Sequence, residues 1–208
     1  MNKEKHIKPL TLGILTSFYD LIANFFSLEK FYKKIAGQIA PESKGHILDV
    51  GTGTANLAIA IKRKSPKTKI LGIDPDGKIL EIAKGKIRKE KLDIKLLKAF
   101  AQELPFKNQS FDYVVSSFAI HHIPSQLKNQ AFYEMYRVLK KGGTILIIDI
   151  GKPKNLLAKI VGTIFSLVES VGPNLRGFIP QALKETGFGD VKEIESKFGL
   201  ISFYRARK

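Results

Sequence analysis

The sequence contains no cysteine among its 208 residues. Disulfide bonds, cysteine-ligated zinc and thiol nucleophiles are therefore excluded. No apolar run is long enough to cross a membrane, because charged residues interrupt the two most apolar stretches, 10–26 and 156–171, and both are shorter than the roughly 20 residues that a span requires. The first residues are polar, and no apolar signal segment follows them. We therefore expect a cytoplasmic protein without a metal site.

Acidic residues are also scarce, since 19 Asp and Glu stand against 35 Lys and Arg and give a formal net charge of +16. Half of this surplus lies in residues 62–98, which hold 13 basic and 5 acidic residues. A solvated lysine-rich face is one explanation, and a surface for a nucleic-acid backbone is the other. A chain of this length with 44% hydrophobic residues fits a single α/β domain.

Apolar runs of strand length alternate with amphipathic segments of helix length along most of the chain. The predicted strands are 46–50, 69–73, 94–98, 112–117 and 143–149, and the predicted helices between them are 54–64, 77–90 and 125–140. This alternation predicts an α/β fold with a Rossmann-like, doubly wound, mostly parallel sheet. We expect Ser125 to cap the start of helix 125–140, and Gly142 with Gly143 to end it.

The segment 46–61 joins an apolar strand, a glycine-rich turn and a helix. The strand carries Asp49 near its end, and the turn contains Gly51 and Gly53, so that the backbone there can approach a ligand closely. Such a turn is typical of a site for a nucleotide-like cofactor. A dinucleotide site requires the spacing G-x-G-x-x-G, and Asn56 occupies its third glycine position. NAD is therefore not the expected ligand.

This turn resembles motif I of the class I S-adenosylmethionine (SAM)-dependent methyltransferases, although Ala55 stands where the family usually has another glycine. Further segments match the family in its order, namely the strand that ends at Asp74, the run 101–117 and the run 138–143. The last two resemble the quinone and sterol group, which includes the menaquinone- and ubiquinone-type methyltransferases. The resemblance covers roughly residues 46–150.

The resemblance implies a seven-stranded sheet within one methyltransferase domain, 1–208. A short helix near 179–186 and strands near 190–196 and 199–206 resemble the antiparallel hairpin that closes the family's sheet. The expected regions are an N-terminal helical cap at 10–40, a SAM-binding core at 41–152, an inserted helical lid at 153–177, and the C-terminal helix and hairpin at 178–208.

The resemblance also implies SAM as cofactor and S-adenosylhomocysteine as product. The residues that it places at the cofactor are Tyr19, Asp49, Gly51, Thr52, Gly53, Asp74, Pro75, Phe100, Ala101 and Ser117. Asp74 either accepts both ribose hydroxyls or caps a helix or forms a turn. Phe100 replaces an acid that many relatives direct at the adenine amino group, so it either stacks on adenine beside the N–H of Ala101 or belongs to the core. Tyr19 either folds over the methionine part or anchors an amphipathic helix.

Two histidines, His121 and His122, follow the fourth predicted strand, where the family's acceptor commonly approaches the methyl group. A base is needed only if the acceptor must lose a proton, and histidine titrates near neutrality, as such a base should. The alternative is that one or both histidines cap this loop and face solvent.

Missing motifs limit the acceptor. The Asp/Asn-Pro-Pro-aromatic clamp of amino-directed nucleic-acid methyltransferases is replaced by the sequence SSFA at 116–119, and methylation of cytosine C5 or arsenite requires cysteine. The Arg-Asn-rich segment of the quinone enzymes is replaced by IHHI at 120–123, so the resemblance does not by itself make the acceptor a quinone.

Apolar residues of the segment 155–168 are expected either to roof an apolar acceptor pocket or only to pack on the core. The N-terminal residues that would join this roof are Phe18, Leu21, Ile22, Phe25 and Phe26. We therefore expect a methyltransferase that moves the methyl group of SAM to a small, partly apolar acceptor by in-line SN2 displacement. The alternatives are an RNA or protein methyltransferase recruited by basic charge, and a SAM-binding protein that does not transfer.

Overall fold

A computed structural model of the chain describes residues 28–39, 45–166 and 170–208. Its centre is a seven-stranded sheet with the order β3-β2-β1-β4-β5-β7-β6. The strands are β1 (His46–Val50), β2 (Lys69–Asp74), β3 (Lys95–Lys98), β4 (Phe111–Ser117), β5 (Leu139–Ile150), β6 (Gly189–Lys197) and β7 (Ile201–Arg207). The first five strands are parallel, and β7 lies antiparallel between β5 and β6. The predicted doubly wound sheet with a closing hairpin is confirmed.

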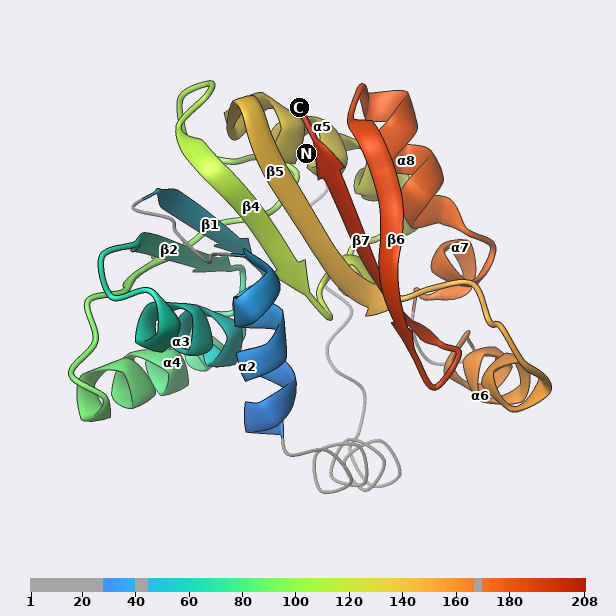
Figure 1. Ribbon diagram of the computed structural model, residues 1–208, viewed down its shortest axis with the longest axis horizontal. Helices are drawn as coiled ribbons and strands as arrows, with labels where there is room; N and C mark the ends of the chain where they lie inside the picture. Colours follow the sequence, from blue (N-terminus) through green and yellow to red (C-terminus); the bar gives the residue numbers. More distant parts are fainter. Residues whose placement is uncertain (1–27, 40–44, 167–169) are drawn as a thin grey trace, which may run out of the picture.

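Helices cover both faces of this sheet (Figure 1). On one face lie α2 (Leu28–Ile39), α3 (Asn56–Lys64) and α4 (Gly77–Lys89), and on the other lie α5 (Lys128–Val138) and α8 (Phe178–Thr186). Two further helices, α6 (Leu156–Ser166) and α7 (Gly172–Leu175), follow β5 in the region of the predicted lid. Two short 3-10 turns, η1 (Ile120–His122) and η2 (Ser125–Leu127), precede α5.

The strands are apolar on both faces, as a sheet covered on both sides requires. In β1, Ile47 belongs to the core between the sheet and α2, α3 and α4, while its neighbour Leu48 belongs to the core between the sheet and α5 and α8. Both side chains are fully buried, and each such residue stabilises the fold by roughly 1.5–3 kcal/mol relative to an exposed one. These two cores hold the carboxyl ends of β1, β2 and β4 in fixed relative positions.

The predicted end of helix 125–140 is wrong. Helix α5 stops at Val138, and Gly142 and Gly143 lie inside β5, where the pairing with β4 shifts register. The last carbonyls of α5 are already satisfied, because the backbone N–H of Ser110 donates to the Val138 oxygen and the Lys208 ammonium donates to the Tyr136 oxygen. A glycine cap is therefore not needed.

The predicted cap at Ser125 is wrong as well, since Ser125 opens η2 and α5 begins after Leu127 without a side-chain cap. Of the expected N-terminal helical cap at 10–40, only α2 falls within the described residues. None of the helices in the described ranges is long and apolar enough to cross a bilayer.

Candidate functional site

The carboxyl ends of β1, β2 and β4 meet where the chain order of the sheet reverses. From β1 the chain winds outward to β2 and β3, and then returns to the other side of β1 as β4. In open α/β sheets, ligands bind in the crevice at such a switch point. The ends of these three strands, together with the loops that leave them, carry most of the residues that the sequence placed at a cofactor.

The glycine turn after β1 is tied to the end of β2 and lies against the loop after β4. The backbone N–H groups of Gly51 and Thr52 donate to the Ile73 oxygen at 2.9 and 2.8 Å. A Cβ atom added at Gly51 would lie 2.2 Å from the Cβ of Ala119, whereas one at Gly53 would meet no described atom within 4 Å. Gly51 is thus required for packing, and Gly53 borders open space that a ligand can fill.

Ala55 adopts a left-handed backbone conformation, with φ of +65°. This is the position where the resembling family usually has glycine, which adopts that conformation without strain. For an L-residue the conformation costs roughly 1–2 kcal/mol. The departure at Ala55 therefore adds strain to the turn in addition to the extra methyl group, and that methyl group is buried in the core.

Asp49 is buried beneath the glycine turn with only one oxygen satisfied. Its Oδ2 accepts from the Thr52 hydroxyl at 2.7 Å, while Oδ1 has no hydrogen-bond partner among the described residues. Burial, with a contribution from nearby Asp74, raises the pKa of Asp49 to about 7, against the opposing effect of the Thr52 hydrogen bond. A buried acceptor without a donor is costly, and an amino group of a ligand would satisfy it.

Asp74 closes β2, and its two oxygens hold the turn in place. Oδ2 accepts from the Gly53 N–H at 3.0 Å, and Oδ1 accepts from the Asp76 N–H at 2.9 Å. The cap of α4 is Asp76, which accepts from the N–H groups of Lys78 and Ile79. The predicted alternative of Asp74 as a helix cap is therefore wrong, although its bond to Asp76 does form a turn. An ionised carboxylate has about four acceptor sites, so ribose hydroxyls can share it.

Phe100 and Ala101 follow β3 on the same side of the sheet. The Phe100 side chain is 48% exposed, so the predicted alternative of a core role for it is wrong. Its exposed ring is available for stacking.

At the end of β4, the Ser117 hydroxyl is buried without a partner in the described part of the chain. Pro75 lies half-buried next to Asp74, and Tyr19 lies outside the described residues.

His121 is buried in the turn after β4 and contacts an acid from β5. Its ring Nδ1 lies 2.7 Å from Oδ1 of Asp149, and both side chains are almost completely hidden from solvent. The ring of His122 lies 4.0 Å from that of His121, centre to centre, and its side chain is exposed. The alternative that the histidines face solvent is thus wrong for His121 and right for His122.

Asp149 is the residue of this site that the sequence analysis missed. Its Oδ2 accepts from the N–H of Ile120 at 2.9 Å and of His121 at 3.3 Å, and its Oδ1 accepts from the N–H of Ile150 at 2.7 Å as well as from the His121 ring. Burial opposes ionisation, but the charge and ring N–H of His121, the Ile150 N–H and the charge of Lys128 outweigh it and lower the pKa of Asp149. An acid inside an otherwise apolar strand is the signal that could have identified it.

Two further polar side chains complete this buried cluster. Lys128, at the start of α5, is fully buried, and its ammonium donates to the Ile120 oxygen. Asn174 of α7 approaches Oδ1 of Asp149 through its Nδ2 at 3.4 Å. The turn that carries His121 is therefore held from β5, α5 and α7 together. No pattern in the sequence distinguishes Lys128 from the many surface lysines.

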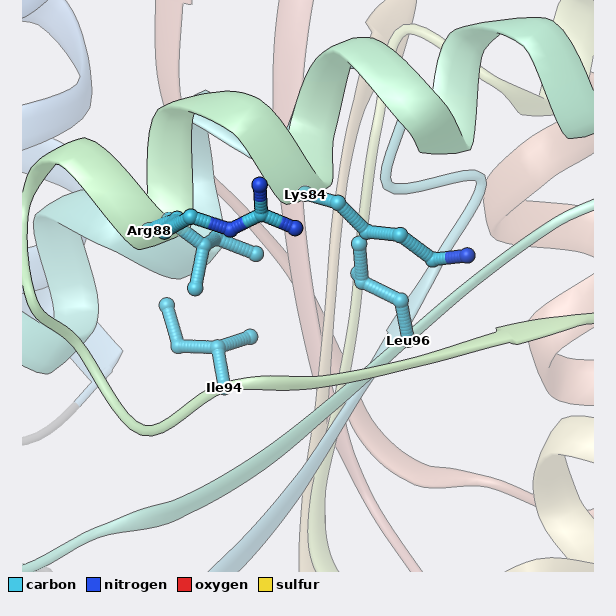
Figure 2. Close-up of a pocket in the computed structure, with 5 residues that line it drawn as sticks. Lys84, Arg88, Ile94 and Leu96 are labelled. Atoms are coloured by element: carbon cyan, nitrogen blue, oxygen red, sulfur yellow. The ribbon is translucent and has the colours of Figure 1, made fainter.

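A separate hollow lies between α4 and the edge strand β3. Figure 2 shows this shallow groove of about 310 Å³, which is lined by Lys84, Ile87, Arg88, Ile94 and Leu96. The groove adjoins the carboxyl-terminal half of α4 and the amino end of β3. It is therefore at the opposite end of these elements from Asp74 and does not belong to the site at the switch point.

The basic segment 62–98 surrounds this groove and is mainly exposed. All of its lysines and arginines are exposed except Lys62 and Lys86. Lys62 donates to the Thr68 oxygen, and Lys86 bridges Thr54 and Asn56 at 2.9 and 3.0 Å. Burial lowers the pKa of Lys86. Asn56, which stands in the third glycine position of a dinucleotide motif, thus connects α3 to α4.

Known proteins are similar to this chain in sequence. A family profile described as a methyltransferase domain matches residues 47–143. The demethylmenaquinone methyltransferase of Lactobacillus johnsonii is 35% identical over 68% of this chain and 60% of its own length. The ubiquinone/menaquinone biosynthesis C-methyltransferase of Geobacter sp. is 28% identical over 94% of each chain. The chain thus spans about 60% of the first relative and nearly all of the second.

Solved structures share the fold at lower identity. A SAM-dependent methyltransferase from Aquifex aeolicus has a TM-score of 0.64 and 20% identity over 84% of this chain and 88% of its own. A phosphoethanolamine N-methyltransferase of Haemonchus contortus, solved in complex with SAM, has a TM-score of 0.67 and 21% identity over 86% of this chain and 52% of its own. The methyltransferase-domain match and the curated relatives, together with the glycine turn, the acids at the carboxyl ends of β1 and β2 and the sheet order, show that the chain belongs to the class I SAM-dependent methyltransferases, and in sequence it is similar to the quinone methyltransferases.

Proposed function

We propose that this chain transfers the methyl group of SAM to a small, partly apolar acceptor and that His121 is the base of the reaction. The observation that carries the proposal is the buried Asp149–His121 pair, with 2.7 Å between Oδ1 and Nδ1. The turn that bears His121 touches the cofactor turn, because Ala119 packs against Gly51. A base and a cofactor site are thereby adjacent at the switch point of the sheet.

The residues present fit SAM. The unsatisfied Oδ1 of Asp49 would accept from the amino group, Asp74 would accept from the ribose hydroxyls, and the exposed ring of Phe100 would stack on adenine. The Ala101 N–H and the buried Ser117 hydroxyl are further candidate contacts on the same edge of the sheet. When bound, SAM supplies a methyl group that its sulfonium has already activated, so the transfer depends mainly on positioning.

His121 would take a proton from the acceptor. An ionised Asp149 accepts the proton of Nδ1, which leaves Nε2 as the ring nitrogen with a free electron pair. The His121 ring, the Ile150 N–H and the charge of Lys128 together outweigh the burial of Asp149, lower its pKa and keep it ionised. Positioned proton transfer of this kind typically accelerates a reaction by about 10²–10⁴. The exposed His122 lies beside this pair, with its ring centre 4.0 Å from that of His121.

The acceptor class follows from the relatives and from the apolar surroundings. The two curated relatives are named for menaquinone and ubiquinone biosynthesis, and α6 places aliphatic side chains near the end of β5. We therefore propose an apolar ring compound, with a reduced demethylmenaquinone as the first compound to test. The replacement of the quinone enzymes' Arg-Asn segment by residues 120–123 argues for a different way of activating the acceptor.

The test measures binding and transfer separately. Calorimetric titration should show binding of SAM and S-adenosylhomocysteine and none of NAD. Radiolabelled SAM should then transfer its methyl group to the reduced quinone or to a component of an apolar metabolite extract, and His121→Gln should reduce this turnover by about 10²–10⁴ without changing SAM affinity. The matched variant His122→Gln should lose much less of the turnover. Tight NAD binding without SAM binding would contradict the cofactor, and full activity of His121→Gln would contradict the base.

A further inference from the structure

The outer surface of α6 is unusual because aliphatic side chains cover two of its three faces. One face packs on the protein through Ala158, Val161, Gly162 and Phe165, against a small core formed by Ile150, Val171, Leu175 and Leu200. The next face exposes Leu156, Leu157, Ile160 and Ile164, and each of these four side chains is 51–74% exposed. Only the third face, with Lys159, Thr163 and Ser166, is polar.

The four exposed side chains form a continuous stripe, here called the outer stripe. Residues 157, 160 and 164 are spaced by three and four positions, so they lie on one side of the helix, and Leu156 stands next to them at its start. The large exposed hydrophobic residues elsewhere on the described surface are separated in sequence, as Ile82 on α4 and Tyr133 on α5 show. A grouped apolar patch of this kind marks a place where a protein meets an apolar partner.

The charged residues of the segment that carries the outer stripe have one sign. Residues 151–166 contain three lysines, at 152, 154 and 159, and no acidic residue. Lys154 pairs with Glu193 of β6 at 2.6 Å, while Lys152 and Lys159 have exposed side chains close to the stripe in sequence. A helix with an apolar face and flanking lysines lies well at the interface of an anionic bilayer, where lipid tails receive the apolar side chains and headgroups attract the lysines.

The place of α6 in the fold gives such an interface a use. The helix follows the carboxyl end of β5 and lies beside the turn of the β6–β7 hairpin, on the side of the molecule away from α3 and α4 (Figure 1). The same end of β5 carries Asp149, which holds His121 and contacts Asn174 of α7. A bilayer that contacts the outer stripe would therefore face the end of the sheet where an apolar acceptor must enter.

We propose that the outer stripe of α6 docks the protein on the surface of an anionic lipid bilayer. The four aliphatic side chains enter the boundary between headgroups and acyl chains, and Lys152 and Lys159 contact the anionic headgroups. Docking at this face delivers an acceptor dissolved in the bilayer to the base at His121, and that purpose rests on the proposed function. The docking itself does not, because lipid binding is measured without any methyl transfer.

The experiment uses the full chain and sedimentation with two kinds of vesicle, one of phosphatidylcholine alone and one of equimolar phosphatidylcholine and phosphatidylglycerol. We expect strong partitioning onto the mixed vesicles and at least about tenfold weaker partitioning onto phosphatidylcholine. The double variant Ile160→Ser with Ile164→Ser should lose at least about tenfold in partitioning onto the mixed vesicles. The double variant Lys152→Gln with Lys159→Gln should partition onto the mixed vesicles roughly fivefold more weakly for each lysine removed. High salt should weaken the partitioning of the wild type to a similar extent.

Matched controls separate docking from general effects. Ile82→Ser removes an equally exposed isoleucine, 55% accessible, from α4 at the side of the molecule away from α6 (Figure 1) and should leave partitioning unchanged. All variants should keep the wild-type melting temperature and SAM affinity. Equal partitioning of the Ile160/Ile164 variant and the wild type would overturn the proposal. Failure of the wild type to bind the mixed vesicles would overturn it as well. In that case, a lowered melting temperature of the Ile160/Ile164 variant would mean that the chain covers its own stripe, and loss of a dimer in this variant would mean that a second copy covers it.

Discussion

Replacing Asp149 with asparagine tests how the site holds its base. The carboxylate serves donors on both of its oxygens, with Ile120 and His121 backbone N–H groups at Oδ2 and with the His121 ring and Ile150 N–H at Oδ1. An asparagine amide keeps one acceptor oxygen and turns the other position into a donor. In either orientation of the amide, at least one buried backbone N–H loses its acceptor.

The size of the effect follows from that loss. An unsatisfied buried donor costs about 1–3 kcal/mol, so one or two of them, together with the lost charge, should lower the free energy of unfolding by roughly 2–5 kcal/mol. For a chain of this size the melting temperature should fall by roughly 5–15 °C. The folded-state pKa of Asp149 is lowered, so its stabilisation is present above the unfolded-state pKa and is lost as pH falls through the folded value. The difference between wild type and variant should therefore shrink in acid.

The same substitution should also lower the rate of methyl transfer, for a separate reason. If the amide NH₂ faces the His121 ring, Nδ1 must accept that hydrogen bond, and the ring proton moves to Nε2, which then cannot act as a base. We expect Asp149→Asn to lower kcat by about 10²–10⁴ with SAM affinity nearly unchanged. The assays are thermal unfolding at neutral and acidic pH, calorimetric SAM binding, and the pH profile of kcat.

The exposed residue Asp93 provides the control, because Asp93→Asn removes the same charge without touching the cluster. Wild-type stability of Asp149→Asn together with an unchanged pH profile of kcat would refute the argument. A stability loss with normal turnover would show that the cluster only supports the fold and that the base lies elsewhere.

Four further predictions concern the cofactor turn and the basic face. Because the pKa of Asp49 is raised to about 7 in the free protein and a cationic amino group favours the ionised form, SAM affinity should fall roughly tenfold per pH unit below 7; titrations from pH 5 to 8 check this, and Asp49→Asn should abolish the dependence. Asp74→Ala should weaken SAM by about 1.5–3 kcal/mol, or roughly 10- to 150-fold in Kd, and an unchanged Kd in a folded variant would limit Asp74 to its turn. Gly53→Val should abolish SAM binding in a folded protein, because a Cβ there meets no described atom within 4 Å and the new side chain would enter the cofactor's space; circular dichroism and calorimetry together decide it. Replacing the exposed Lys89 and Lys91 with glutamine should leave turnover of a small acceptor unchanged. The basic-charge alternative would be favoured instead if the protein transferred methyl groups to an RNA, bound that RNA with a steep salt dependence, and showed a flatter salt dependence after these substitutions.

Much of the site could be predicted because its signals are local. Gly51, Gly53 and the acids at the carboxyl ends of β1 and β2 lie within short runs where an apolar strand passes directly into a turn. Parallel strands bring all their carboxyl ends to one edge, so identifying the strands was enough to gather these residues. The departure at Ala55 was also visible in the sequence, but its backbone strain was not, because φ depends on how the turn is tied to Ile73.

The parts that could not be predicted depend on contacts between distant segments. Helix propensity and the glycine pair after it predict a helix that runs to residue 140, yet the carbonyls of α5 find partners in the loop before β4 and at the C-terminal Lys208. Burial of single side chains is equally hard to predict from residue type. Phe100 is aromatic yet half exposed, and Lys86 is charged yet half buried. Residue type alone does not determine which neighbours a side chain receives.

The sequence by itself determined the α/β alternation, the glycine turn, the two acids at strand ends and the family to which they belong. Each of these depends on hydrophobic period and on backbone freedom over a few adjacent residues. Only the tertiary structure decided that His121 is buried against Asp149, 28 positions away, and that one face of α6 stays exposed while another packs on Leu200. The physical reason is that burial and proton position are set by groups that fold together from β4, β5, α5 and α7, and no local pattern encodes their distances.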